Sequence, residues 1–304
     1  MSWVRFPSPA PSYIFRLPTD LLEVFFCIAG ENIWKPHPSP YILDITYRSL
    51  GGKRMNIQSI QLSSNPQSTL TAYLLDTTKR MKNITTRPAV LILPGGGYYY
   101  TSDREAEPVA MAYLSEGYHA FTLRYSVGEA KRFEDSFRDA EEALAYIRNH
   151  ASELGVDPER IAVVGFSAGG HLAASLGTMG TYRPRALILG YPCILSNLED
   201  VLAFPVPSLE EKVDGNTPPS FLFSTFEDRI VPVEHTVEFI RALTRAGVPF
   251  ESHIFQHGVH GLSLGKPLSS AGQRSMVDDD FSQWFQLSIS WLHRLMGDFP
   301  LDRE

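Results

Sequence analysis

The chain has 304 residues, of which 43% are hydrophobic and 20% charged, proportions that are ordinary for a globular protein. Its 27 lysines and arginines against 34 aspartates and glutamates give a net charge of −7, and without a basic face we expect no nucleic-acid partner. Two cysteines, Cys27 and Cys193, supply neither a disulfide framework nor a metal-binding cluster.

The N-terminal stretch, residues 1–40, is rich in prolines and aromatic residues and has no periodic pattern. Prolines interrupt its first apolar residues, so we expect no secretory signal and a cytoplasmic location. Residues 21–29 are apolar apart from Glu23, but this run is too short to span a bilayer, so we expect no membrane span. Long irregular segments are often functional, and the stretch is either an arm packed on the core or a partial lid.

The next segments have the pattern of strands. Residues 41–47 and 56–62 alternate apolar and polar side chains around Gly51-Gly52, which predicts an antiparallel hairpin that residues 69–75 continue. Residues 88–94 are continuously apolar, as in a strand buried on both faces of a parallel sheet.

From there onward, strand patterns alternate with helical ones. The helical patterns cover residues 105–116, 133–150, 233–246 and 279–295, and the strands 118–123, 161–166, 186–189, 220–225 and 250–255. This alternation is typical of a mostly parallel α/β sheet with helices on both faces, preceded here by antiparallel strands. No linker interrupts it, so residues 41–304 are predicted to form one domain, with an irregular segment at 193–217 near the site.

A serine lies at the sharpest predicted turn. Four apolar residues lead into Gly165-Phe166-Ser167-Ala168-Gly169, and a helical pattern follows. Glycine fits where a tight turn leaves no room for a Cβ. A Gly-x-Ser-x-Gly between strand and helix is a nucleophile elbow, which presents the serine hydroxyl above the sheet. We therefore expect Ser167 to be a nucleophile.

A serine nucleophile needs a histidine base and an acid that orients it, and in this strand-turn-helix setting they follow the serine in the order acid, then histidine. The loop after the last predicted strand offers His257 and His260, at the sheet edge where ligands bind, and we favour His260 because a glycine follows it. The loop after residues 220–225 offers Glu227 and Asp228; Asp228 is the choice and Glu227 the alternative.

An oxyanion hole needs two backbone N–H groups aimed at the developing charge. One is expected from Ala168, directly after the serine. The other is expected from the glycine-rich loop at residues 95–97, which follows the first buried strand. The neighbouring residues Tyr98, Tyr99, Tyr100 and Pro192 are candidates for the wall of the substrate pocket, although each could equally pack in the core.

Five segments carry a family resemblance: LPGGGY at 93–98, RDAEEALAYIR at 138–148, DPERIAVVGFSAGGHLAASL at 157–176, TPPSFLFSTFEDRIVPVEHTVEF at 217–239 and GVPFESHIFQHGVHGLSL at 247–264. With them the chain resembles an α/β-hydrolase of the acetyl-esterase/feruloyl-esterase-like branch. The resemblance implies an α/β-hydrolase fold. It also implies Asp228 as the acid, His260 as the base, and Gly96 and Gly97 as the loop side of the oxyanion hole.

The activity implied is that of a serine carboxylic ester hydrolase that works through an acyl-enzyme, on short-acyl or aromatic small-molecule esters. It needs no metal and no organic cofactor, and a homodimer is compatible with it. The same triad could instead act on thioesters, amides or carbon–carbon bonds, or transfer the acyl group, because fold and triad do not separate these reactions. A binding module that kept the fold is a further alternative, which the intact Ser, Asp and His set disfavours.

Overall fold

The computed structural model describes residues 55–78 and 80–301. The predicted strand at 41–47 and the stretch 1–40, predicted as an arm or partial lid, lie outside these residues. In the described part of the chain, no helix combines the length and apolar character needed to cross a membrane.

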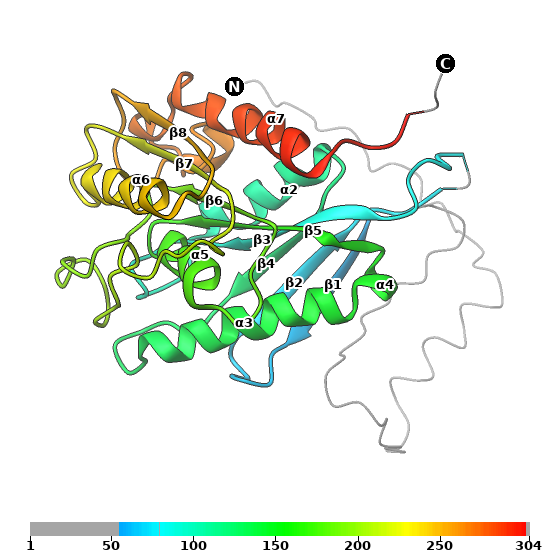
Figure 1. Ribbon diagram of the computed structural model, residues 1–304, viewed down its shortest axis with the longest axis horizontal. Helices are drawn as coiled ribbons and strands as arrows, with labels where there is room; N and C mark the ends of the chain where they lie inside the picture. The colour runs from blue at the N-terminus through cyan, green and yellow to red at the C-terminus, as the bar shows by residue number, and fades with distance from the viewer. Residues whose placement is uncertain (1–54, 79, 302–304) are drawn as a thin grey trace, which may run out of the picture. The chain divides into compact units, whose positions relative to one another are not determined.

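Within the described residues, eight strands form one sheet in the order β1-β2-β4-β3-β5-β6-β7-β8 (Figure 1). β1 and β2 pair antiparallel, as do β2 and β4, and every later pairing is parallel. The strands are β1 Asn56–Gln61, β2 Thr69–Leu74, β3 Arg87–Leu93, β4 His119–Arg124, β5 Val156–Phe166, β6 Ala186–Gly190, β7 Ser220–Thr225 and β8 Phe250–Phe255. The mostly parallel α/β sheet with antiparallel N-terminal strands is thereby confirmed.

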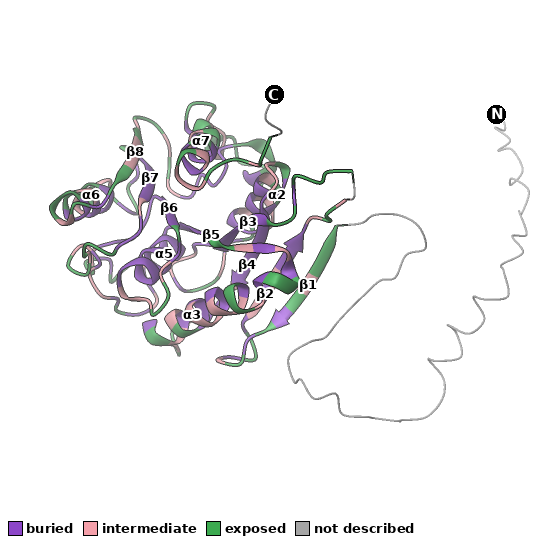
Figure 2. Ribbon diagram, turned by 45° about the vertical axis from the view of Figure 1, so that its right-hand side comes forward, coloured by how far each residue is buried: buried purple, intermediate pink, exposed green. Residues whose placement is uncertain are grey.

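Helices cover both faces of the sheet. One apolar core lies between the sheet and the helices α3, α5 and α6, and a second lies between the opposite face and α2 and α7. Every residue of β3, β6 and β7 is buried, whereas the edge strands β1 and β8 are largely exposed or half-buried (Figure 2). The helices are α2 Glu107–Ser115, α3 Phe133–Asn149, α4 Ala151–Leu154, α5 Ala168–Met179, α6 Glu234–Ala246 and α7 Trp284–Met296.

Two element boundaries differ from the prediction by more than two residues. β5 begins at Val156 and not at Ile161: Val156 already pairs with Arg87 of β3, residues 157–160 form an irregularity at which the register shifts, and pairing resumes at Ile161. The proline within this irregularity removes a ladder donor without ending the strand. The last α-helix begins at Trp284 and not at residue 279, since a short 3₁₀ turn over Phe281–Gln283 precedes it.

The sheet topology decides where the site forms. Parallel strands direct their carboxyl ends to one edge, so the loops that follow β3, β5, β7 and β8 open onto the same side of the sheet. These loops carry the predicted glycine-rich loop, Ser167, Asp228 and His260 respectively.

Candidate active site

Ser167 occupies a strained turn between β5 and α5. Its backbone has φ 53° and ψ −119°, a conformation that side-chain-bearing residues rarely adopt and that costs about 1–3 kcal/mol. A Cβ on Gly165 would lie 2.2 Å from the carbonyl oxygen of Gly169, and one on Gly169 would lie 2.0 Å from that of Leu93. Only glycine fits at both positions, so the motif spacing follows from the close approach of the backbones.

Hydrogen bonds join Ser167, His260 and Asp228 in a row. The Ser167 hydroxyl lies 2.8 Å from His260 Nε2, and His260 Nδ1 lies 2.6 Å from Asp228 Oδ2. Asp228 is 5% exposed, and its other oxygen accepts the backbone N–H groups of Ile230 and Val231 at 2.9 and 3.0 Å. An acceptor at Nδ1 keeps the proton on that nitrogen and leaves Nε2 free to accept the proton of the serine.

The two alternatives from the sequence, His257 and Glu227, pair with each other. His257 Nδ1 lies 2.9 Å from Glu227 Oε1, and both side chains are more than half exposed. Because Glu227 pairs with His257, Asp228 is the carboxyl that pairs with His260. The pair holds the pKa of Glu227 below its usual range, mainly through the hydrogen bond to His257.

Three backbone N–H groups are available for an oxyanion. Among the described residues, the amides of Gly96, Gly97 and Ala168 have no protein acceptor, whereas the amide of Ser167 donates to the carbonyl of Gly190 at 3.0 Å. Gly96 and Gly97 have φ of 125° and 62°, which favour glycine. The structure thus places all three predicted oxyanion residues around Ser167, with the N–H of Ala168 at the start of α5.

Glu105 is a buried carboxyl beside these groups. It is 3% exposed, and it accepts the N–H of Gly95 at 2.8 Å and the hydroxyl of Tyr191 at 2.6 Å. Burial raises the pKa of Glu105, and the two hydrogen bonds oppose that shift. Since Gly95 donates to Glu105, its amide is not available to a substrate.

A cavity of about 250 Å³ opens over Ser167. Besides Ser167, the residues that line it are Gly96, Gly97, Tyr99, Tyr100, Ser102, Arg104, Glu105, Val201, Ile230, His260 and Gly261. A wider groove of about 780 Å³ is lined by Phe226, Ile230, Val259 and His260 among others. The small cavity and the wide groove share Ile230 and His260, so the two spaces adjoin at these residues.

Of the four residues predicted to form the pocket wall, two line the cavity and two do not. Tyr99 lines the cavity, as does Tyr100, but Tyr98 is fully buried and its hydroxyl lies 2.9 Å from Nδ1 of His171. Pro192 is not among the residues that line the cavity; it packs against the backbone of Gly170, where an added Cβ would lie 2.8 Å from the proline ring. Tyr98 and Pro192 are therefore packing residues.

The sequence did not indicate six residues that line the cavity: Ser102, Arg104, Glu105, Val201, Ile230 and Gly261. Ile230 stands two residues after Asp228, so proximity to the acid could have indicated it. Val201 comes from the irregular segment 193–217, in which no periodic pattern exists to follow.

Two buried groups near the nucleophile are held neutral. His171 has Nε2 2.9 Å from the carbonyl oxygen of Pro207, and burial lowers its pKa to about 4. The Cys193 thiol lies 3.9 Å from the Ser167 hydroxyl, and burial raises its pKa to about 12. A protonated thiol is a weak nucleophile, so Cys193 does not compete with Ser167.

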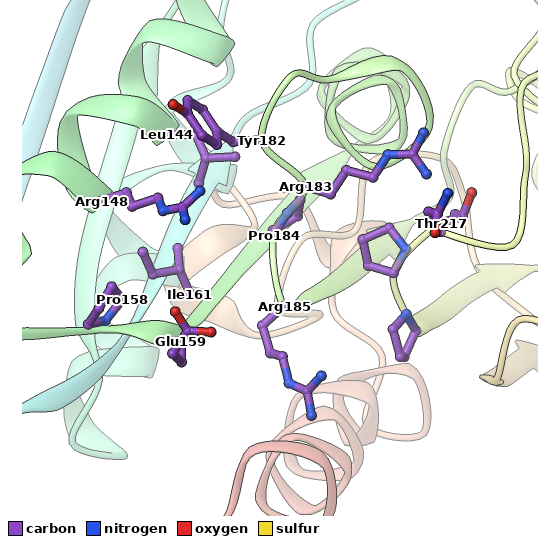
Figure 3. Close-up of a pocket in the computed structure, with 13 residues that line it drawn as sticks. Leu144, Arg148, Pro158, Glu159, Ile161, Tyr182, Arg183, Pro184, Arg185 and Thr217 are labelled. Carbon is purple, nitrogen blue, oxygen red and sulfur yellow. The ribbon is translucent and has the colours of Figure 1, made fainter.

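A separate pocket of about 310 Å³ lies at the opposite edge of the sheet, near the amino ends of β5, β6 and β7 (Figure 3). Its arginines have partners of their own, since Arg183 pairs with Asp214 and Arg148 lies over the ring of Tyr182 at 4.7 Å. It contains none of the residues that surround Ser167. In the described ranges, no group of three or more His, Cys, Asp or Glu side chains could hold a metal ion.

Comparison with known proteins gives concordant similarities. A family model described as BD-FAE matches residues 75–200. Endo-1,4-beta-xylanase B of Butyrivibrio fibrisolvens is 30% identical over 231 residues, and acetylxylan esterase of Xylanibacter ruminicola is 28% identical over 199 residues. These matches cover 65% and 58% of this chain but only 34% and 41% of the two relatives, so the chain spans less than half of their length.

A solved structure matches almost end to end. MGS-M1, an alpha/beta hydrolase enzyme from a Medee basin deep-sea metagenome library, is 48% identical, with a TM-score of 0.76. The match covers 80% of this chain and 98% of MGS-M1. Sequence and fold thus agree over nearly the whole of that chain.

Proposed function

The chain belongs to the α/β-hydrolase family, in its acetyl-esterase-like branch, and on that premise we propose that it is a serine carboxylic ester hydrolase acting through an acyl-enzyme. The observation that carries the proposal is the row of hydrogen bonds from Ser167 through His260 to Asp228. A serine hydroxyl becomes a useful nucleophile only when a base within hydrogen-bond reach can take its proton.

In the proposed mechanism Ser167 attacks the ester carbonyl carbon while His260 Nε2 accepts the hydroxyl proton. Asp228 keeps the imidazole in the required tautomer and stabilises the imidazolium that forms. The N–H groups of Gly96, Gly97 and Ala168 stabilise the negative oxygen of the tetrahedral intermediate. His260 then gives its proton to the departing alcohol, and the reaction leaves an acyl group on Ser167.

The second half of the reaction repeats the first with water. His260 removes a proton from water, the resulting hydroxide attacks the acyl carbon, and the same amides stabilise the second intermediate. Proton return to Ser167 releases the carboxylic acid and restores the enzyme. Every proton passes through His260.

The size of the cavity supports a short acyl group. At about 250 Å³ it lies below the usual range of pockets for drug-sized ligands, and Val201 and Tyr99 are among its lining residues. We therefore propose acetyl-type esters as substrates, with a small-molecule alcohol on the other side. Relatives named as esterases favour ester hydrolysis over acyl transfer or cleavage of thioesters, amides or carbon–carbon bonds. A homodimer and a cytoplasmic location stay predictions.

Labelling with a fluorophosphonate probe tests the proposal, because the probe reacts with activated serines. The wild type should label at Ser167, and Ser167→Ala should not. A series of p-nitrophenyl esters from acetate to octanoate then tests the short-acyl expectation, with turnover falling steeply as the chain lengthens. A folded wild-type protein that neither labels nor hydrolyses any of these esters would refute the assignment.

A further inference from the structure

We propose that Glu105 is a positioning residue of this active site, one that fixes the oxyanion loop and the histidine loop relative to Ser167. The inference rests on the proposed function, since it concerns the same reaction. Glu105 makes no hydrogen bond to Ser167 or His260, and its two hydrogen bonds go to Gly95 and Tyr191, so we assign its effect on the reaction to the groups it holds.

The first of these groups is the oxyanion loop. Glu105 Oε2 accepts the N–H of Gly95 at 2.8 Å, and the next two residues are Gly96 and Gly97. An added Cβ on Gly95 would lie 2.8 Å from this carboxyl oxygen, so the loop and the carboxyl are in close contact. The carboxyl thus anchors the loop at the residue immediately before its two free amides.

The second group is Tyr191, which connects the carboxyl to the histidine loop. Its hydroxyl donates to Glu105 Oε1 at 2.6 Å and accepts the N–H of Ser263 at 2.9 Å. Its ring meets the ring of His260 edge-on, with centroids 5.0 Å apart. Tyr191 directly follows β6, has φ 34°, and is 2% exposed. This buried side chain therefore touches the base itself and the backbone three residues beyond it.

A second set of bonds holds the same two segments together. The Arg104 guanidinium donates to the carbonyl of Gly261 at 2.9 Å, and the Ser263 hydroxyl donates to the carbonyl of Arg104 at 2.6 Å. Residues 104 and 105 thus hold the stretch after His260 at three points. The Arg104 and Ser263 bonds do not need the Glu105 carboxyl, so its loss should shift the loops without detaching them.

The chemistry of a carboxyl matches this double task. A carboxylate offers two acceptor oxygens, and here one receives an amide N–H and the other a phenol O–H. A glutamine of the same shape has one acceptor and one donor, so it can satisfy only one of the two. Burying an acid is unfavourable unless hydrogen bonds compensate, and both oxygens of Glu105 are compensated in this way.

The expected consequence is a loss of turnover with little change in substrate binding. Displacing an oxyanion amide or the base by a fraction of an ångström weakens interactions formed only in the transition state, and a 1 Å error can reduce rate by about 100-fold. We expect Glu105→Gln to lower kcat by roughly 10- to 100-fold, with KM within a factor of about 3.

The experiment compares Glu105→Gln and Tyr191→Phe with the wild type. Two quantities are measured in each protein: the rate constant for fluorophosphonate labelling of Ser167, and kcat and KM for p-nitrophenyl acetate per labelled site. Tyr191→Phe removes the link to Ser263 but leaves the bond between Glu105 and Gly95, so we expect a smaller loss, about 10-fold. Glu107→Gln is the matched control, because that carboxyl pairs with Arg124 outside the cavity, and its kcat should equal that of the wild type.

The outcomes separate this inference from the proposed function. If the wild type labels and both variants label at its rate, Glu105 is a packing residue and the inference fails while the esterase assignment stands. A rise in KM in both variants without a fall in kcat also overturns the inference. If Glu105→Gln does not fold, judged by circular dichroism, Tyr191→Phe alone decides. A wild type that never labels refutes both proposals.

Discussion

Replacing Asp228 by asparagine tests the assigned site with one atom changed. In the wild-type protein Asp228 Oδ2 accepts the Nδ1 proton of His260 at 2.6 Å, and Oδ1 accepts the N–H groups of Ile230 and Val231. Asparagine can keep only one oxygen, and the two backbone donors require it. The amide NH₂ must then face His260 Nδ1, where a donor meets a donor.

The imidazole resolves that clash by changing tautomer. Nδ1 becomes the acceptor, the proton moves to Nε2, and Nε2 can no longer take the proton of Ser167 from 2.8 Å away. Loss of the correct tautomer lowers kcat by roughly 10⁴-fold in serine hydrolases of this design. At 1.36 kcal/mol for each tenfold change, this is about 5.4 kcal/mol of transition-state stabilisation. The melting temperature should change little, because both backbone hydrogen bonds remain.

The assay is p-nitrophenyl acetate hydrolysis at saturating substrate, with Glu227→Gln as the matched control. Glu227 is the neighbouring carboxyl, pairs with His257 at the surface, and should be replaceable with kcat unchanged. A folded Asp228→Asn variant that keeps more than about a tenth of wild-type kcat would refute the role of Asp228 as the orienting acid. A large loss in Glu227→Gln instead would transfer that role to Glu227.

Three further predictions concern the wall, the oxyanion loop and acid stability. Val201→Ala widens the small cavity, so turnover of butyrate relative to acetate esters should rise by about 10-fold or more. Gly97→Ala introduces a Cβ 2.5 Å from the carbonyl oxygen of Val201 at φ 62°, and kcat should fall roughly 100-fold while circular dichroism stays native; unchanged kcat would contradict the oxyanion role. For His171, with a folded-state pKa of about 4 against about 6.5 unfolded, the unfolded chain binds more protons between these values. The contribution of His171 alone to the free energy of unfolding should therefore fall by up to about 3 kcal/mol as pH falls from 6.5 to 4. Urea titrations of His171→Gln should show a shallower pH dependence than the wild type.

Much of the fold, together with Ser167, Asp228 and His260, could be predicted because local sequence patterns and local backbone geometry determine them. Glycine is required on either side of Ser167, because a Cβ added at Gly165 or Gly169 would lie 2.2 Å or less from a backbone carbonyl oxygen. The turn therefore dictates the motif. The acid follows β7, which is buried throughout, and the base follows the edge strand β8, and the alternation of strands and helices predicts both strands to be parallel. Parallel strands then bring their loops to one edge without further information.

The choice between neighbouring side chains could not be predicted in the same way. Tyr98, Tyr99 and Tyr100 stand in a row on a loop, and only the backbone of that loop decides which one points inward. With φ 61°, Tyr98 turns into the core toward His171, and the other two line the cavity. The burial of Glu105 could not be predicted either, because an acid at the start of a predicted helix is usually exposed.

The part of the cavity wall that contains Val201 is connected to the oxyanion loop through a backbone hydrogen bond and not through side chains. Val201 belongs to the irregular segment 193–217, and this segment meets the oxyanion loop through the N–H of Ala203, which donates to the carbonyl of Gly97 at 2.8 Å. That bond survives any side chain at position 201. Substitutions there can change which acyl group fits while the loop keeps its place. Substrate preference is therefore free to vary independently of Ser167, His260 and Asp228, and an irregular segment with no periodic constraint is where such variation is tolerated.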